Sequence, residues 1–197
     1  MTDDRRFAQL TSIACHELRT PLATVSGFAR TLARLELAEP AGQYAGMIEA
    51  AAAQLRDLLE QLTIVARIET GRFDPALGEI DTLELARAAS EELGDDRVSV
   101  SGSGSPVCVP VEAMRRAVTQ LARAALRHGG LDLVELHADG HVLELSPTTR
   151  MSGAVLSGEE LRDVGALAAG ALVRALGGSL ELDGERLLVV LPALPGG

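Results

Sequence analysis

The sequence predicts an α+β protein: an N-terminal helical hairpin that pairs with a second copy into a dimeric four-helix bundle, followed by a small two-layer α/β sandwich. Two patterns lead to this prediction. Apolar residues recur at steps of three and four over the first third of the chain, as in packed helices. The remainder mixes short alternating strands with amphipathic helices, as in layered α/β domains. With 197 residues, 47% of them hydrophobic, the chain can form one large domain or two small ones.

The first third predicts two helices that pack side by side. The apolar stripe of the first comprises Phe7, Leu10, Leu18, Pro21, Val25, Phe28, Leu32 and Leu35. That of the second comprises Tyr44, Ile48, Ala51, Leu55, Leu58, Leu62 and Val65, which is a heptad pattern. The stretch AEPAGQ (38–43) predicts a short antiparallel connection. Because a lone hairpin buries little apolar surface, we expect a homodimer.

A domain boundary is expected where ETGRFDPALGE (69–79) ends the second helix at Gly71 and introduces Pro75. This gives a first domain at 1–73, a linker at 74–80 and a second domain at 81–197. The second domain is expected to hold helices at 81–93, 111–128 and 158–178 and strands at 97–102, 106–110, 131–138, 141–146, 179–183 and 186–192. Helices segregated from mostly antiparallel strands make a two-layer sandwich.

The composition excludes several classes of function. The formal charge of −10 disfavours binding to nucleic acid or to an anionic membrane. All 18 residues counted as Lys or Arg are arginines, which excludes mechanisms built on a catalytic or phosphate-gripping lysine. Cys15 and Cys108 are expected to be reduced thiols. Since the sequence has neither a signal peptide nor an apolar run long enough to span a bilayer, we expect a cytoplasmic protein without a membrane span.

The stretch CHELRTPLATVSGF (15–28) carries candidate chemistry. On a helix, Thr20 lies one turn beyond His16 on the same face, and Glu17 is about 100° round from His16. A neutral imidazole nitrogen is a nucleophile, and a nearby carboxylate can stabilise the cation formed on attack. Pro21 lacks the N–H that would bind the carbonyl of Glu17, so the helix is expected to bend there. An exposed His–Glu pair beside an incidental kink is the alternative reading.

HELRTPL closely resembles the phosphoacceptor motif of two-component sensor histidine kinases. FAQLTSIACHELRTPLATVSGFARTL and LRDLLEQLTIVARIETGRF resemble the two helices of that family's dimerisation and phosphotransfer domain, over roughly residues 5–73. The resemblance implies that His16 is the phosphorylated histidine and Glu17 its acid–base partner. It also implies that Thr20 positions water when the phosphoryl group is removed from a response regulator.

The remainder resembles the Bergerat-type ATP-binding sandwich of the same family, but the nucleotide-contacting positions differ. In VEAMRRAVTQLARAALRHGG, Gln120 and Ala124 occupy the expected asparagine positions, and an alanine supplies no oxygen ligand to Mg²⁺. ELSPTTRMSG lacks the aspartate of the adenine motif, RDVGALAAG keeps only Gly165 of the phosphate loop, and the lid shrinks to 148–160. We therefore expect a degenerate domain that binds no cofactor and does not use ATP.

Three functional hypotheses follow from the resemblance. In the first, the chain resembles kinase-derived histidine phosphotransfer proteins, and His16 exchanges a phosphoryl group with the aspartates of response-regulator receiver domains, which supply Mg²⁺. An upstream sensor kinase is a further expected partner. In the second, the chain is an ATP-dependent histidine autokinase with a divergent nucleotide site. In the third, it is a non-catalytic pseudokinase that binds response regulators or kinases. Response-regulator phosphatase activity through Thr20 is compatible with all three.

The remaining histidines and the arginines of the predicted helix at 111–128 are expected to have structural rather than catalytic roles. His137 and His141 flank the predicted Asp139-Gly140 turn, and no further ligand at a suitable spacing makes them a metal site. His128 ends a predicted helix, where it interacts favourably with the helix dipole. The arginines of that helix are expected to be solvated: Arg115, Arg116, Arg123 and Arg127.

Overall fold

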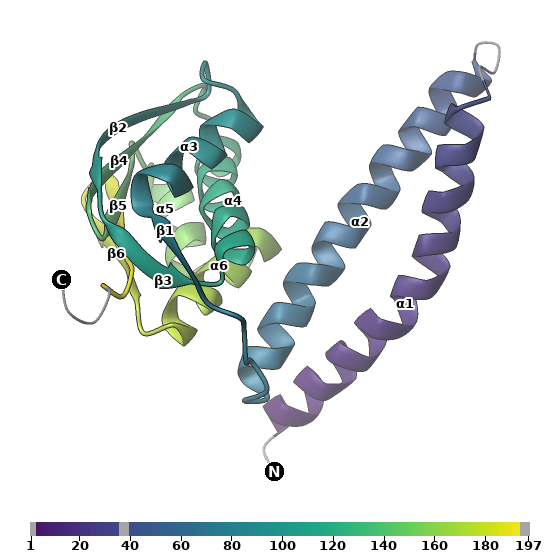
Figure 1. Ribbon diagram of the computed structural model, residues 1–197, viewed down its shortest axis with the longest axis horizontal. Coiled ribbons are helices and arrows are strands. Elements are labelled where there is room, and N and C mark those ends of the chain that lie inside the picture. Colours follow the sequence, from purple (N-terminus) through teal and green to yellow (C-terminus); the bar gives the residue numbers. More distant parts are fainter. Residues whose placement is uncertain (1–2, 36–39, 194–197) are drawn as a thin grey trace. The chain divides into compact units, whose positions relative to one another are not determined.

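A computed structural model describes residues 3–35 and 40–193 and divides the chain into two compact units, residues 1–73 and 74–197. The first unit is all helical, and the second combines strands with helices (Figure 1). The predicted linker at 74–80 is too long, because strand β1 (Gly78–Asp81) begins within it.

The first unit is an antiparallel hairpin of α1 (Asp3–Ala33) and α2 (Ala41–Glu69). Two side-chain contacts connect the helices. Arg56 Nη2 donates a hydrogen bond to Ser26 Oγ at 3.3 Å, and Arg30 Nε lies 3.5 Å from Glu49 Oε1. Residues 38 and 39 of the predicted connection, and the side chains of Phe7 and Leu10, lie outside the described part of the chain.

Small residues form the contact between α1 and α2. The buried residues of α2 recur every seven positions and are Ala45, Ala52, Leu59 and Ala66. On α1 the buried residues described are Cys15, Ser26 and Ala29. Small side chains on both helices allow their backbones to approach closely.

Most of the large residues of the two predicted stripes lie on a different face, whereas Leu62 and Val65 are half-buried. Those on the different face are between 41% and 68% exposed: Leu18, Val25, Phe28, Leu32, Leu35, Tyr44, Ile48, Leu55 and Leu58. Within one chain, these large side chains are thus left without cover, and we call them the exposed apolar face.

The second unit is built on a five-stranded sheet with strand order β2–β4–β5–β7–β6. The strands are β2 (Val98–Gly104), β4 (Val134–Gly140), β5 (Val142–Ser146), β6 (Ser179–Asp183) and β7 (Arg186–Val190). β2 and β4 are parallel, and the other neighbours are antiparallel. Strands β1 and β3 (Pro106–Val109) pair separately as a two-stranded antiparallel sheet.

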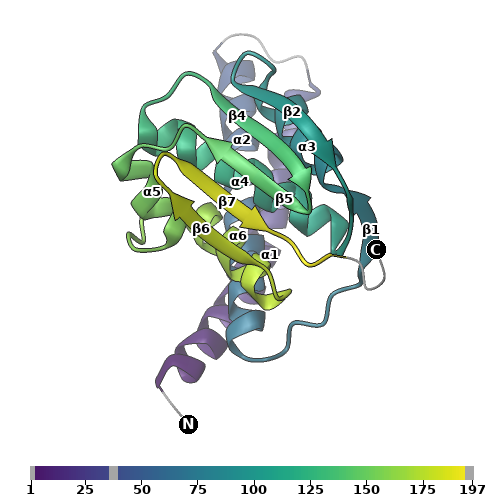
Figure 2. The same cartoon turned by 90° about the vertical axis from the view of Figure 1, so that its left-hand side faces the viewer.

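Four helices cover one face of the five-stranded sheet, which confirms the predicted two-layer sandwich (Figure 2). They are α3 (Thr82–Leu93), α4 (Val111–Gly129), α5 (Arg150–Ser157) and α6 (Val164–Ala175). Fully buried side chains from both layers form the core, among them Leu85, Met114, Leu121, Leu136, Leu143, Leu145, Leu172 and Leu187.

Residues 148–178 differ from the prediction. A lid and one helix at 158–178 were expected, but α5 forms within the lid and α6 begins only at Val164. Gly158 ends α5 in the left-handed conformation, with φ of 86°, which a glycine adopts without strain. Asp163 then accepts a hydrogen bond from the Ala166 N–H and so starts α6.

Candidate functional site

The predicted phosphoacceptor residues lie on the surface of α1. His16, Glu17 and Thr20 are all exposed, and Thr20 is one helical turn beyond His16. Among the described residues, no hydrogen bond or ion pair engages the imidazole of His16 or the carboxylate of Glu17. Both groups are therefore accessible to a partner molecule.

Neighbouring residues anchor this part of α1. Cys15, next to His16, is only 2% exposed, and its thiol is free, as the sequence predicted. The helix continues through Pro21, which lacks the N–H that would bind the Glu17 carbonyl. Three residues later, Thr24 Oγ1 donates a hydrogen bond to the Thr20 carbonyl at 3.2 Å. Cys15 is thus buried in this turn, while His16 next to it is exposed.

The positions predicted to be degenerate nucleotide contacts lie in the second unit, on α4 and α6. The structure brings Gln120 and Gly165 together: a Cβ atom added to Gly165 would lie only 2.7 Å from Gln120 Oε1. Ala124 is 1% exposed and belongs to the packed face of α4. The protein's own atoms therefore fill the space beside these positions.

Helix α5 occupies the segment predicted to be a shortened lid. A capping box starts it, with Thr149 Oγ1 accepting from the Ser152 N–H at 3.2 Å and Ser152 Oγ accepting from the Thr149 N–H at 2.9 Å. Ser152, Val155 and Leu156 are at most 2% exposed. This segment is thus a packed part of the sandwich. The sequence signal was a Thr-x-x-Ser spacing, which lacks the Glu or Gln of the usual capping box.

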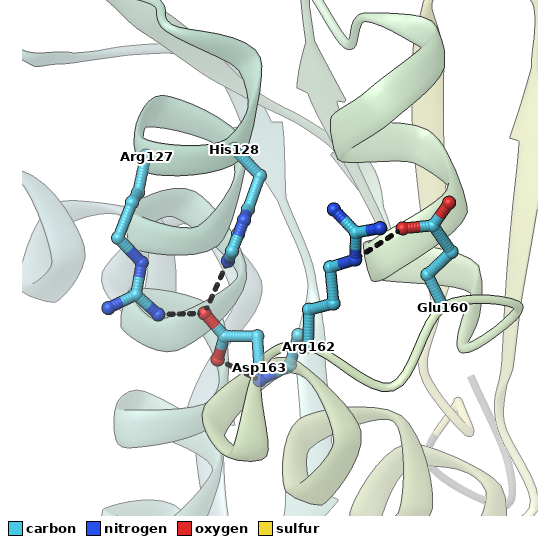
Figure 3. Close-up of polar contacts among 6 residues, drawn as sticks. Arg127, His128, Glu160, Arg162 and Asp163 are labelled. Carbon is cyan, nitrogen blue, oxygen red and sulfur yellow. Dashed lines mark hydrogen bonds and ion pairs between the residues drawn. The ribbon is translucent and has the colours of Figure 1, made fainter.

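A polar cluster at the junction of α4 and α6 was missed from the sequence (Figure 3). The side chain of Asp163 is only 5% exposed, and its carboxylate accepts hydrogen bonds from three donors. Oδ1 accepts from the Ala166 N–H at 3.0 Å, and Oδ2 accepts from Arg127 Nη2 and from His128 Nε2, the latter at 3.0 Å. The one available sequence signal was an aspartate before the apolar helix of residues 164–175.

The charge state of Asp163 follows from these contacts. Burial alone would raise the pKa of its carboxyl, but the hydrogen bonds from Ala166, His128 and Arg127 outweigh burial and hold the pKa below its usual value. Asp163 is therefore a carboxylate at neutral pH.

Two arginines expected to be solvated are indeed exposed to solvent, and each also forms an ion pair. Arg127 pairs with Asp163, and Arg123 Nη2 lies 2.7 Å from Glu92 Oε1. His128, expected to interact only with the helix dipole, also contacts Asp163.

Other predicted positions fall outside these sites. His137 Nδ1 lies 2.7 Å from Ser101 Oγ, while His141 is exposed. Over the described ranges, no group of three or more His, Cys, Asp or Glu side chains could hold a metal ion. None of the helices described is long and apolar enough to cross a bilayer. A hollow of about 930 Å³ lies beside α5 and the β6–β7 turn, and Gln120, Ala124 and Gly165 do not line it.

Comparison with known proteins agrees with the division of the chain into these two units. Residues 8–71 match the His Kinase A phospho-acceptor domain. The chain is 33% identical over 185 residues to the histidine protein kinase DivJ of Caulobacter vibrioides, a match that covers 85% of this chain and 31% of DivJ. The chain belongs to the two-component sensor histidine kinase family. It spans about a third of the length of this curated family member.

Solved histidine kinase structures share the fold. Full-length ShkA in complex with AMPPNP superposes with a TM-score of 0.66 at 18% identity, over 94% of this chain and 47% of ShkA. The Acinetobacter baumannii histidine kinase AdeS gives a TM-score of 0.57 at 14% identity, over 88% of this chain and 94% of the AdeS chain. The second unit therefore has the fold of the histidine kinase ATPase domain.

Proposed function

We propose that this chain is a histidine phosphotransferase of a phosphorelay, in which His16 exchanges a phosphoryl group with response-regulator aspartates. The proposal rests on the difference in accessibility between His16 and the positions that would contact a nucleotide. His16 is exposed, whereas Ala124 is 1% exposed and Gln120 lies against Gly165. A phosphoryl group on a partner protein can reach His16, while Mg²⁺ at position 124 would meet a buried methyl group and no oxygen ligand.

The proposed transfer is a direct displacement at phosphorus. A nitrogen of the His16 imidazole attacks the aspartyl phosphate of the regulator, so that a P–N bond forms and the P–O bond to the aspartate breaks. The aspartate leaves as a carboxylate, and Glu17 stabilises the positive charge that develops on the imidazole. Mg²⁺ held by the regulator neutralises the phosphoryl oxygens. The reverse reaction passes the group to a second regulator.

Thr20 is proposed to serve a hydrolytic side reaction. Its exposed hydroxyl, one turn from His16, can hold a water molecule that attacks the regulator's aspartyl phosphate. The products are inorganic phosphate and the free carboxylate. In this role Thr20 makes the chain a response-regulator phosphatase as well as a phosphotransferase.

The proposed active form is a homodimer. The exposed apolar face includes Phe28, 68% exposed, and Leu55, 53% exposed, and an apolar face of this extent favours association. A second copy would offer the same residues, so the two hairpins would form a four-helix bundle through an isologous interface. Light scattering of the full chain measures this state directly.

An ATP-dependent autokinase is the second candidate. It is favoured by one observation: ShkA, which shares the fold, is in complex with AMPPNP. In this case the phosphoryl group on His16 would come from ATP bound by the second unit. The third hypothesis, a pseudokinase that binds regulators without chemistry, enters as an outcome of the test.

The deciding experiment compares two phosphoryl donors. The purified chain is incubated with Mg²⁺ and γ-labelled ATP, and separately with a labelled phospho-regulator and Mg²⁺. The variant His16→Ala removes the acceptor, and His141→Ala, an exposed histidine of the second unit, is the matched control. We expect label from the regulator in the wild type and in His141→Ala, and none in His16→Ala.

The other outcomes contradict the proposal. Label on His16 from ATP alone would establish the autokinase. A chain that binds the regulator but takes label from neither donor would be a pseudokinase.

A further inference from the structure

Strand β6 forms one edge of the five-stranded sheet. It comes last in the strand order and pairs with β7 (Figure 2). Because alternate residues of an antiparallel strand turn their N–H and C=O groups away from the neighbouring strand, an edge strand presents a row of unpaired backbone groups. In the described part of the chain, no backbone hydrogen bond from outside the sheet reaches residues 179–183. This edge can therefore pair with one more strand.

A hollow with an apolar side adjoins this edge. It measures about 930 Å³ and lies between α5 and the β6–β7 turn, with Met151 and Leu182 in its lining. Met151 is 58% exposed and Leu182 is 40% exposed. Gly153 brings α5 close to β6, since a Cβ atom added to it would lie 3.4 Å from Leu182 Cδ1. The hollow thus offers space for an apolar side chain of a strand added to β6.

The hollow and the adjoining strand carry unpaired negative charge. Glu159 and Glu185 line the hollow, and Asp183 ends β6. All three are exposed, and within residues 3–35 and 40–193 no hydrogen bond or ion pair engages their carboxylates. Glu160 also lines the hollow but pairs with a neighbouring arginine (Figure 3). Among the described residues of the lining, Arg150 is the basic one, so unpaired carboxylates predominate.

This charge decides which occupant fits the edge. A second copy paired through β6 would bring Glu181 and Asp183 close to the same acidic residues, and like charges on paired strands are destabilising. An anionic membrane surface would be repelled as well. A cationic extended segment would meet opposite charge while its backbone pairs with β6.

We propose that β6 and the adjoining hollow form a docking site for an extended, arginine- or lysine-bearing segment of a partner protein. The segment adds to the sheet as a further strand and places an apolar side chain beside Met151 and Leu182. The site lies within the second unit and shares no residue with the phosphotransfer site proposed around His16. Its test can therefore fail or succeed independently of the phosphotransfer test.

Labelled synthetic peptides test the proposal by fluorescence anisotropy with the full chain. One peptide alternates arginine with valine around a central leucine, and a second has glutamate in place of arginine. We expect the arginine peptide to bind at least about tenfold more tightly than the glutamate peptide, because only its charge is complementary.

Two further peptides test the backbone pairing. Each is the arginine peptide with N-methyl groups on one of the two sets of alternate backbone nitrogens. Only alternate N–H groups of a strand face its neighbour, so we expect one set of methyl groups to abolish binding and the other to be tolerated.

Variants of the chain locate the site. Leu182→Ala removes apolar surface from the hollow and should weaken binding of the arginine peptide about tenfold. Glu159→Gln combined with Glu185→Gln should weaken it about fivefold, since two exposed charge pairs are lost. The matched control combines Glu91→Gln with Asp96→Asn, two exposed acidic residues near the start of the opposite edge strand β2, and should change Kd by less than about twofold.

Several results would overturn the proposal. They include no binding of the arginine peptide, equal binding of the glutamate peptide, and binding that neither set of N-methyl groups affects. An equal loss in the matched control would show a general effect of charge. Self-association of the full chain, or binding to vesicles of anionic phospholipid, that Leu182→Ala abolishes would assign this edge to a second copy or to a membrane.

Discussion

Replacing Asp163 by alanine should destabilise the second unit by about 2 kcal/mol. Loss of the helix cap costs about 1 kcal/mol. Loss of the hydrogen bond with His128, whose side chain is 18% exposed, costs about another 1 kcal/mol. The ion pair with Arg127 adds at most about 0.5 kcal/mol, because 61% of the arginine side chain is exposed to solvent.

Hydrogen exchange provides the assay. The Ala166 amide donates directly to Asp163, and its neighbours in α6 report the opening of the second unit. A loss of about 2 kcal/mol corresponds to exchange about 30-fold faster for amides that exchange through this opening. The control Glu92→Ala should cost about 0.5 kcal/mol or less, since both partners of the Arg123 pair are at least 40% exposed. Equal costs for the two variants would refute the reasoning that burial makes Asp163 the more important partner.

Three further predictions concern pH, packing and association. Because the folded pKa of Asp163 is lowered, its stabilising effect is fully present above the usual value of 3.8 and is lost as pH falls below it. The difference in free energy of unfolding between wild type and Asp163→Asn, measured by urea unfolding, should therefore become smaller in acid. A difference that does not change with pH would contradict this prediction. Gly165→Ala should cost about 1–3 kcal/mol by thermal unfolding, because its Cβ would lie 2.7 Å from Gln120 Oε1, and Gln120→Ala should recover most of the loss. Leu55→Asp should give a monomer by light scattering, while Leu133→Asp, at a similarly exposed leucine of the second unit, should not; dimers from both would place the interface elsewhere.

The hairpin shows what the spacing of apolar residues can and cannot predict about the structure. The spacing of Tyr44, Ile48, Leu55 and Leu58 correctly predicted a helix, but these side chains are 41% to 58% exposed and are not the buried residues at the contact with α1. That contact uses a parallel row of mainly alanines, which a search for large apolar residues passes over. Periodicity thus identifies an apolar face without identifying what covers it.

Residues 148–163 show where local signals were weak. The capping box of α5 has Ser152 where Glu or Gln is usual, and α5 has only 8 residues, too few for a clear period. The predicted helix at 158–178 began too early because the capping role of Asp163 was overlooked. β1 was missed since its partner β3 lies far along the chain.

The cluster around Asp163 could not be predicted from sequence spacing. Arg127 and His128 are separated from Asp163 by more than thirty positions and meet it only because α4 packs beside α6. By contrast, the spacing of His16, Glu17 and Thr20 could be read from the sequence because their relation is local to one helix. HELRTPL could be compared with the family's motif for the same reason, because its residues are contiguous in the sequence.

The row of small residues between α1 and α2 has a consequence for how the protein behaves on dilution. An alanine methyl group removes little apolar area from water, at about 0.8 kcal/mol for each buried carbon, so a single hairpin gains little cohesion from Ala45, Ala52 and Ala66. Most of the apolar surface that could stabilise this unit faces outward. In the proposed homodimer, the integrity of the segment bearing His16 would depend on protomer concentration by mass action. Protein abundance would then set the fraction of chains that can take part in signalling.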